Sequence, residues 1–290
     1  MASLKEIKGR IGSVKSTQKI TSAMKMVASA KLRKAQSNIE RFLPYETRLT
    51  DILKRFIASD ANDFVSPLMQ TRETKKVAVV ALSSNSSLCG AFNSNIIKIL
   101  TETIKKYSAI GCEIEIYAIG KKIEEAARKM DLPVNIKGGY AELMDKPNYE
   151  GAKAVADRLI ADFTAKKIDK VVLLYNHFKS AGVQVPANEQ FMPLILPETE
   201  QNDLPSDYII EPDRQTLLDT LLPKSLRTKI YAVLLDSAAA EQAARTVAMQ
   251  VATDNADEIL DGLTIQFNKQ RQQSITSELL DIIGGAEALK

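Results

Sequence analysis

Two residues of the sequence could carry nucleophilic chemistry, Cys89 and His177. Cys89 lies in SSNSSLCG, between an apolar run typical of a buried strand and a run typical of a helix. A thiol at the amino end of a helix ionises more readily, and the single histidine could act as its base. The pair would suit a cysteine-dependent hydrolase. However, nothing in the sequence brings the two residues together, and the apolar neighbours Leu88 and Phe92 favour a buried structural thiol.

The remaining groups that could do chemistry point away from an enzyme. The carboxylate pairs Glu124-Glu125 and Asp257-Glu258 fall on predicted helices, where a solvated face explains them. The sequence has no GxGxxG after a strand and no GxxxxGK[ST], so it lacks a loop that cradles phosphates. Cys89 and Cys112 form no CxxC motif, and they predict neither a zinc site nor a disulfide framework. We therefore expect no catalytic residue, no metal and no cofactor bound by this chain.

The composition is that of an ordinary soluble protein. A chain of 290 residues with 45% hydrophobic content can bury a sizeable core. No run approaches the roughly 18 apolar residues of a membrane span, and the first residues lack the apolar core of a signal peptide. A cytosolic location is the expectation from these features.

The net charge of +3 hides an uneven distribution along the chain. Residues 1–55 hold 13 basic and 4 acidic side chains, which gives this segment a charge of +9. A basic helix is often only a solvated face, but it can also meet nucleic acid or an acidic protein. Because no aromatic residue that could stack on bases occurs before Phe42, we expect no nucleic acid; a solvated face and an acidic protein partner both stay open.

The amino-terminal segment, residues 1–58, is predicted to be one long helix of a coiled coil. Positions spaced alternately three and four apart are apolar in twelve of sixteen cases. A helix of this extent would be about 80 Å long at 1.5 Å per residue. The seam fails over Gln18, Thr21 and Lys25, where the apolar side moves to neighbouring positions such as Ile20. Either the register drifts there, or that length of helix has a second surface to meet.

The middle of the chain predicts an α/β domain over residues 75–200, after a link at 59–74. Apolar strand patterns occur at 77–82, 113–119 and 170–175, with further β-like runs at 182–185 and 191–196. Helical patterns lie between them. Strands that alternate with helices predict a mainly parallel, Rossmann-like sheet that is covered by helices.

The carboxy-terminal segment, residues 213–290, follows a second link at 201–212 and predicts another long helix. It starts near Asp213, is interrupted by Pro223, and carries an apolar stripe onward. Small side chains gather from Ala238 to Ala244, which predicts the tightest contact with the amino-terminal helix there. Since the chain leaves along one helix and returns along the other, the pair should be antiparallel. The fold class is thus α/β, with a long coiled coil of the terminal helices.

Three blocks of the sequence are similar to those of a known family. IKGRIGSVKSTQKITSAMKMVASAKLRKAQ at the start and EQAARTVAMQVATDNADEILDGLTIQFNKQRQQSITSELLDIIGGAEAL at the end resemble the gamma-subunit family of bacterial F-type ATP synthases, and so does LCGAFN at 88–93. The resemblance covers the chain from end to end. One departure concerns the residues before Leu88, where the family usually has Asp-Arg-Gly and this chain has Asn85, Ser86 and Ser87.

This resemblance implies a non-catalytic rotor shaft. In the family the two terminal helices enter a ring of three alpha and three beta subunits, while the α/β domain sits with epsilon on the ring of c subunits. Catalysis belongs to the beta subunits. The resemblance further implies the cytoplasmic face of the bacterial inner membrane, with membrane contact only through the c ring, and coupling of hydrogen ion transport to ATP synthesis.

The family's contact residues transfer to this chain by motif. Met24 and Lys25 would face the acidic lever of a beta subunit, and Arg271 and Gln272 would meet its catch loop. The same contact set implies Arg245, Thr276 and Glu278. The foot that touches the c ring and epsilon implies Tyr208 and Glu211. A third reading from the residues alone, an unrelated coiled-coil scaffold, would instead predict a helix pair that self-associates.

Overall fold

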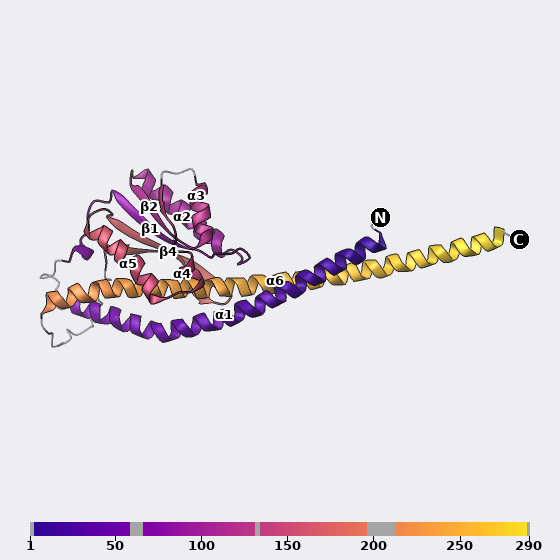
Figure 1. Ribbon diagram of the computed structural model, residues 1–290, viewed down its shortest axis with the longest axis horizontal. Coiled ribbons are helices and arrows are strands. Elements are labelled where there is room, and N and C mark those ends of the chain that lie inside the picture. The colour runs from indigo at the N-terminus through magenta and orange to yellow at the C-terminus, as the bar shows by residue number, and fades with distance from the viewer. Residues whose placement is uncertain (1–2, 59–65, 131–133, 196–210, 212, 289–290) are drawn as a thin grey trace. The chain divides into compact units, whose positions relative to one another are not determined.

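The computed structural model describes residues 3–58, 66–130, 134–195, 211 and 213–288, with the side chains of 287 and 288 left aside. Its helices are α1 (Leu4–Ala58), the 3-10 helix η1 (Pro67–Met69), α2 (Phe92–Ala109), α3 (Lys121–Lys129), α4 (Glu142–Asp145), α5 (Tyr149–Thr164) and α6 (Arg214–Ala288). Its strands are β1 (Lys76–Leu82), β2 (Glu113–Ile119), β3 (Val134–Lys137), β4 (Lys170–Ser180) and β5 (Val183–Met192). Figure 1 shows these elements.

The chain divides into two compact units, each described by itself. Unit 1 comprises Met1–Ala28 and Thr246–Lys290, which are the first part of α1 and the last part of α6. Unit 2 comprises Ser29–Arg245 and contains the sheet, its helices and the remaining parts of α1 and α6.

The sheet of unit 2 has the order β3-β2-β1-β4-β5. Strands β3, β2, β1 and β4 run parallel, and β5 pairs antiparallel with β4 at one edge. Six of the seven residues of β1 are buried, as expected for a central strand with helices on both faces. The prediction of a mainly parallel sheet is therefore confirmed.

Alternate residues of the central strands supply two separate cores. Val77, Val79 and Ala81 face α2 and α3, whereas Ala78 and Val80 face α5 and the long helices. Leu53 and Phe56 of α1 belong to this second core, and so do six residues of α6: Leu218, Leu222, Leu226, Ile230, Val233 and Leu234. Unit 2 is thus a three-layer domain in which the terminal helices form part of one layer, as Figure 1 shows.

The observed elements differ from the predicted ones at several places in the sheet and its connections. Residues 183–185 and 191–192 of the two predicted β-like runs belong to one strand, β5, which pairs with β4 in a hairpin; residues 193–195 are not in a strand, and residue 196 lies outside the described residues. The sequence analysis also missed β3 and the short helix α4. Both are only four residues long and partly exposed, so neither has the apolar run or the helical period that pattern analysis needs.

Helix α6 begins where predicted, but Pro223 does not interrupt it. The Asp213 carboxylate accepts hydrogen bonds from the Thr216 backbone N–H (2.8 Å) and hydroxyl (2.7 Å), and these bonds lower its pKa. The helix then runs through Pro223 without a break. Leu222 and Leu226 on either side are fully buried, and their packing offsets the hydrogen bond that proline removes. Helix α1 likewise continues through Pro44.

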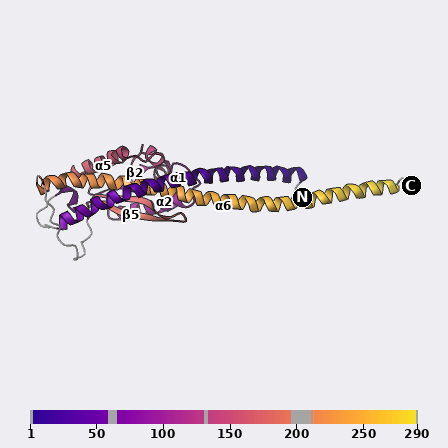
Figure 2. The same cartoon turned by 90° about the horizontal axis from the view of Figure 1, so that it is seen from below.

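The terminal helices pair antiparallel in both units, as predicted. In unit 2, Phe42 packs edge-on against Tyr231 at 4.8 Å, and Phe56 lies beside Arg214. In unit 1, Gln18 meets Asp257 and Thr21 meets Thr253. In each unit, the contact made by the later residue of α1 is with the earlier residue of α6, as an antiparallel pair requires. Figure 2 shows the two helices side by side. None of the helices described here is both long and apolar enough to cross a membrane.

Candidate partner-contact surfaces and the turn held by Arg245

The polar residues of the α1 seam in unit 1 are paired across the helices. The hydroxyls of Thr21 and Thr253 lie 2.8 Å apart, and the Gln18 amide donates to the Asp257 carboxylate at 2.5 Å. Ile20 and Val27 instead point outward, with 59% and 57% of their surfaces exposed. The helix therefore keeps its register through the polar stretch, and the alternative of a drifting register is wrong.

Unit 1 presents many aliphatic side chains to solvent. On α1 these are Ile20, Met26 and Val27. On α6 they are Val247, Val251, Ile259, Ile265, Ile275, Leu279, Leu280, Ile282 and Ile283. Exposed aliphatic residues in such number on a helix pair mark a surface that binds another protein.

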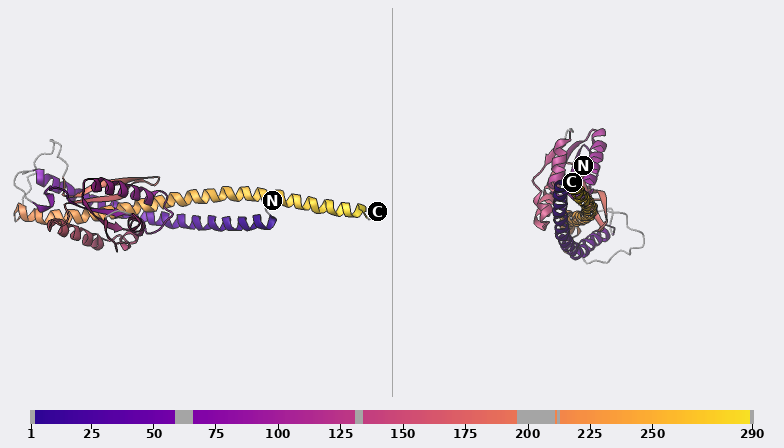
Figure 3. Two further views of the ribbon diagram at one scale, coloured as in Figure 1. Left: turned by 90° about the horizontal axis from the view of Figure 1, so that it is seen from above. Right: turned by 90° about the vertical axis from the view of Figure 1, so that its right-hand side faces the viewer.

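The last part of α6 has no helical partner in unit 1. Because Gln18 lies opposite Asp257 in an antiparallel pair, the start of α1 lies opposite residues near about 271. From Arg271 to Ala286 every side chain is exposed except the half-buried Ser274. Figures 1 and 3 show α6 running past the amino-terminal end of α1. Residues 271–288 are the single-helix end of α6, and the side chains described for it, those up to 286, form the longest exposed run of the described helices.

Four residues implied by the resemblance lie on this single-helix end. Arg271, Gln272, Thr276 and Glu278 are all exposed, and the Thr276 hydroxyl donates to the Gln272 carbonyl at 2.9 Å. Met24 and Lys25 are half-buried on α1. Glu211 is exposed ahead of α6, whereas Tyr208 lies outside the described residues. The described positions thus lie on three separate stretches of the chain, namely α1, the residues before α6 and the end of α6.

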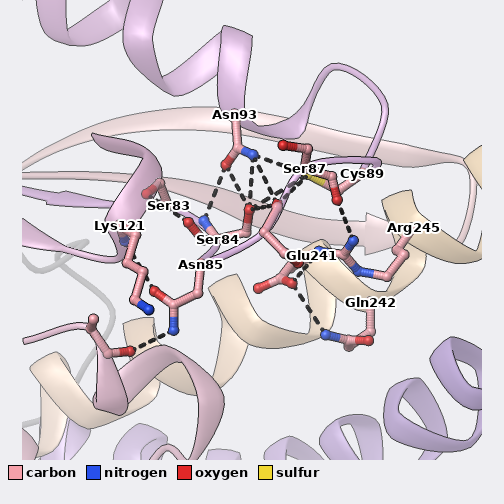
Figure 4. A network of polar contacts seen from close by, with 12 residues as sticks. Ser83, Ser84, Asn85, Ser87, Cys89, Asn93, Lys121, Glu241, Gln242 and Arg245 are labelled. Atoms are coloured by element: carbon pink, nitrogen blue, oxygen red, sulfur yellow. Dashed lines mark hydrogen bonds and ion pairs between the residues drawn. The ribbon is translucent and has the colours of Figure 1, made fainter. Parts of the chain in front are cut away.

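A network of polar contacts holds the turn between β1 and α2, residues 83–91 (Figure 4). The Asn93 side chain accepts from the Ser84 backbone N–H at 3.1 Å, and its amide donates to the Ser84 hydroxyl at 2.8 Å. Leu88 and Gly90 adopt left-handed φ values of 65° and 58°. A leucine in this conformation is strained, so the surrounding contacts must hold the turn in place. Gly120 is needed beside it, because a Cβ there would strike the Ser83 carbonyl.

Arg245 of α6 joins this turn. One guanidinium nitrogen donates to the Ser87 carbonyl at 2.5 Å, and the other forms an ion pair with Glu241 at 2.7 Å. The Arg245 and Glu241 side chains are only 10% and 8% exposed. Burial raises the pKa of the Glu241 carboxyl, and the Arg245 charge opposes that rise. The Arg245 guanidinium thus has a hydrogen-bond acceptor and an ion-pair partner inside unit 2, whereas the other α6 residues implied by the resemblance are exposed.

The small residues of α6 near Arg245 pack against two different neighbours. Ala239 and Ala243 pack against Leu32 of α1, as predicted from their size. Ala240 and Ala244 instead pack against Cys89 and Phe92 at the turn. The alanine stripe therefore lets α6 approach both α1 and the α/β domain.

The geometry does not support the hydrolase hypothesis. Cys89 is 1% exposed and lies in the core formed with Phe92, Ala240 and Ala244. Its thiol contacts Asn93 at 3.2 Å and Ser84 at 3.6 Å. The His177 ring instead lies 2.7 Å from the Asp236 carboxylate. Cys89 is thus a structural thiol without access for a substrate.

The comparisons with known proteins agree over the whole chain. The family model described as ATP synthase matches residues 3–289. An ATP synthase gamma chain of Azobacteroides pseudotrichonymphae is 55% identical over 100% of both chains. Gamma chains of Phocaeicola vulgatus and Flavobacterium johnsoniae are 50% and 43% identical, each with at least 99% of both chains covered.

The chain belongs to the ATP synthase gamma-chain family. Its function follows from the family: it is the central rotor shaft of a membrane-associated F-type ATP synthase, and catalysis lies in the beta subunits. Both alternatives, the hydrolase and the unrelated scaffold, are thereby wrong.

Solved structures show the same fold. A chain from the central stalk and c ring of the Tetrahymena thermophila mitochondrial ATP synthase has a TM-score of 0.57 at 23% identity, covering 80% of this chain and 99% of that one. A chain from the Euglena gracilis mitochondrial ATP synthase has a TM-score of 0.66 at 17% identity, covering 99% and 94%.

The structure gives a physical account of part of the unusual sequence before Leu88. The Asn85 side chain accepts from the Lys121 backbone N–H at 3.0 Å and donates to the Ala141 carbonyl at 2.7 Å. It therefore joins the turn to the start of α3 and to the residue before α4. An aspartate could make the first contact but not the second. Nothing in the structure explains Ser86.

Sequence reasoning missed Asp236 and Glu241. Asp236 accepts from the Phe178 backbone N–H at 2.9 Å and from His177, so it fastens β4 to α6. Its partners are about sixty residues away in sequence, and no pattern indicates them. Glu241 and Arg245 are four residues apart, and this spacing is the one signal that could have predicted their ion pair.

Proposed function

We propose that the chain turns as a shaft inside a ring of three alpha and three beta subunits, and that its α/β domain meets the epsilon subunit and the ring of c subunits. The single-helix end of α6 carries this proposal. An exposed helix with Ile275, Leu279, Leu280, Ile282 and Ile283 on its surface needs an enclosing apolar partner. Because these side chains are 49–67% exposed, burying the rest of each would contribute about 1 kcal/mol, roughly half the value for a fully exposed one.

The mechanism rests on differential contacts. An asymmetric shaft presents a different face to each of three otherwise identical catalytic subunits, so each is biased toward a different conformation. Rotation exchanges these biases. The chain itself supplies contacts and stiffness, and the +9 segment of α1 offers attraction to acidic levers that breaks and re-forms without deep burial.

Particular contacts follow from the family motifs. Met24 and Lys25 face the acidic lever of a beta subunit, and Arg271, Gln272, Thr276 and Glu278 face its catch loop. Their positions on an exposed helix pair and its single-helix end support this assignment. Tyr208 and Glu211 belong to the foot near epsilon and the c ring. Arg245, which the family motif assigns to the same contact set, has its described partners within the chain.

The location and the lack of a cofactor complete the proposal. The chain is peripheral on the cytoplasmic face of the bacterial inner membrane, where it reaches the bilayer only through the c ring. It binds neither a cofactor nor nucleic acid, because its role needs contacts rather than chemistry.

Reconstitution tests the proposed function. Purified alpha and beta subunits are mixed with and without this chain, then gel filtration and ATPase activity are measured. One copy of the chain should join three alpha and three beta subunits, and turnover should appear. If the chain elutes alone and activity does not change, the proposal fails.

A charge reversal tests the contact at Lys25. Lys25→Glu should lower the number of protons pumped per ATP hydrolysed in membrane vesicles, because the reversed charge repels an acidic lever. The chain's own unfolding midpoint should change little, since Lys25 is only half-buried. Lys105→Glu makes the same change at an exposed position of α2, outside the +9 segment, and is the matched control. Equal pumping per ATP in Lys25→Glu and parent membranes contradicts the assignment.

A further inference from the structure

Helix α6 is fastened to the α/β domain by a series of polar contacts within unit 2. From the start of the helix onward they are Arg227 with Asp157 of α5, Lys229 with Glu189 of β5, Asp236 with His177 and Phe178 of β4, and Arg245 with Ser87 of the turn. The Arg227 and Lys229 pairs are about one third exposed, so solvent screens them. The Arg245 contact is different, because both Arg245 and its ion-pair partner Glu241 are buried.

The shape of the arginine side chain is essential to this contact. Its two terminal nitrogens take separate partners, Glu241 on the same helix and Ser87 on the turn. A planar guanidinium holds such a two-sided geometry, and hydrogen bonds from a charged donor are the stronger ones. A lysine could keep the pair with Glu241, but it has a single nitrogen and a shorter reach. The contact to Ser87 is therefore specific to arginine.

The turn is built to receive a cation. In open α/β sheets the crevice at the carboxyl ends of the strands usually binds a ligand through helix amino termini and backbone N–H groups. Here the turn after β1 directs a backbone carbonyl, that of Ser87, at the Arg245 guanidinium (Figure 4). Ala240 and Ala244 of the same helix seal the apolar side against Cys89 and Phe92. At the carboxyl end of β1 the turn thus contacts the chain's own α6.

We propose that Arg245 is a positioning residue that locks the 83–91 turn to α6, so that torque passes between the α/β domain and α6 at this contact. The inference rests on the proposed function, because only a rotating shaft carries torque. It assigns Arg245 an internal mechanical role, in addition to the contact that the family motif implies. The strained Leu88 explains the need for a lock, since a turn in this conformation relaxes when its partners are lost.

Two substitutions separate the lock from simple stability. Arg245→Gln removes the ion pair with Glu241 and shortens the side chain that reaches the Ser87 carbonyl. Arg245→Lys keeps a positive charge beside Glu241 but loses the hydrogen bond to the Ser87 carbonyl. Arg128→Gln is the matched control, because Arg128 pairs with Glu124 four residues away at the same 2.7 Å but joins no second element among the described residues. Each variant is assembled into the complete ATP synthase in membrane vesicles. ATP hydrolysis, proton pumping and amide hydrogen exchange of residues 84–91 are measured.

We expect both Arg245 variants to lose proton pumping per ATP and to exchange the turn amides faster, while Arg128→Gln matches the parent. The lysine variant should keep the parent's thermal stability more closely than the glutamine variant. Parent-like pumping in both Arg245 variants overturns the proposal. Full recovery of pumping by lysine also overturns it, because the charge next to Glu241 would then be enough.

The parent complex distinguishes this proposal from the function on which it rests. If the parent chain assembles and pumps protons while the Arg245 variants pump equally well, the lock alone is wrong. If the parent chain neither assembles with alpha and beta subunits nor supports pumping, the proposed function itself fails.

Discussion

Asn85→Asp would give the turn after β1 the acidic residue that the family usually carries. In this chain the Asn85 amide donates to the Ala141 carbonyl at 2.7 Å, while its oxygen accepts from the Lys121 N–H. A carboxylate keeps the second contact and gains from the amino terminus of α3. It also turns an attractive contact with Ala141 into repulsion between two oxygens.

The size of these effects predicts the net result. Loss of a neutral hydrogen bond costs about 0.5–1.5 kcal/mol, and the oxygen–oxygen repulsion adds to it. A negative charge at a helix amino terminus contributes about 0.3–1 kcal/mol in the other direction. We therefore expect Asn85→Asp to lower the free energy of unfolding by about 1 kcal/mol, which moves a urea midpoint down by about 0.3–1 M.

Tyrosine fluorescence during urea unfolding of the full chain measures this shift, with Asn85→Ala as the control that loses both contacts. The deficit of the Asn85→Asp variant should shrink as the pH falls toward about 4, because the carboxyl regains its proton in the folded chain before it does so in the unfolded chain and can then donate to Ala141. This requires the pKa of the introduced carboxyl to be higher in the folded than in the unfolded variant. A midpoint at pH 7 equal to or above that of the parent would refute the reasoning.

Two further predictions concern the seam and the alkaline limit of stability. Replacing both Thr21 and Thr253 by Val should lower the free energy of unfolding by less than the sum of the two single changes, because only the double variant removes both hydroxyls of the pair. Circular dichroism during urea unfolding of the three variants measures this difference, and simple additivity would contradict it. Burial raises the pKa of Tyr117 to about 12, above its value of about 10 in the unfolded chain, so stability is full below pH 10 and falls between pH 10 and 12. Tyr117→Phe should flatten the fall of the unfolding midpoint in that window, and an unchanged slope would count against this origin.

The sequence predicted the elements that long patterns specify. The central strands and the two terminal helices came from continuous apolar runs and a sustained seam, and the burial of Leu53 and Leu226 follows the same periods. Pro223 misled the analysis because local propensity opposes a helix there, while burial against the sheet decides otherwise. The single strand β5 was split in two because Asn188 to Gln190 are polar, although they pair with β4.

The candidate contact surfaces were harder to predict than the fold. Lys25 and Arg271 could be chosen only through a resemblance, since a charged residue on a long helix has no pattern of its own. The inward position of Arg245 depends on Ser87, which is 158 residues away in sequence. Asn85 looked like an unexplained departure because its two partners, at Lys121 and Ala141, become neighbours only when the chain folds.

The single-helix end of α6 has a consequence for the order of assembly. A helix of this length without a packed face is only marginally stable in water, and much of its order must come from the surface that encloses it. Part of the binding free energy is then used to fix its backbone. On the proposed function, the end of the shaft therefore completes its folding inside the ring of alpha and beta subunits, and a ring that encloses it would favour a correctly seated shaft before rotation begins.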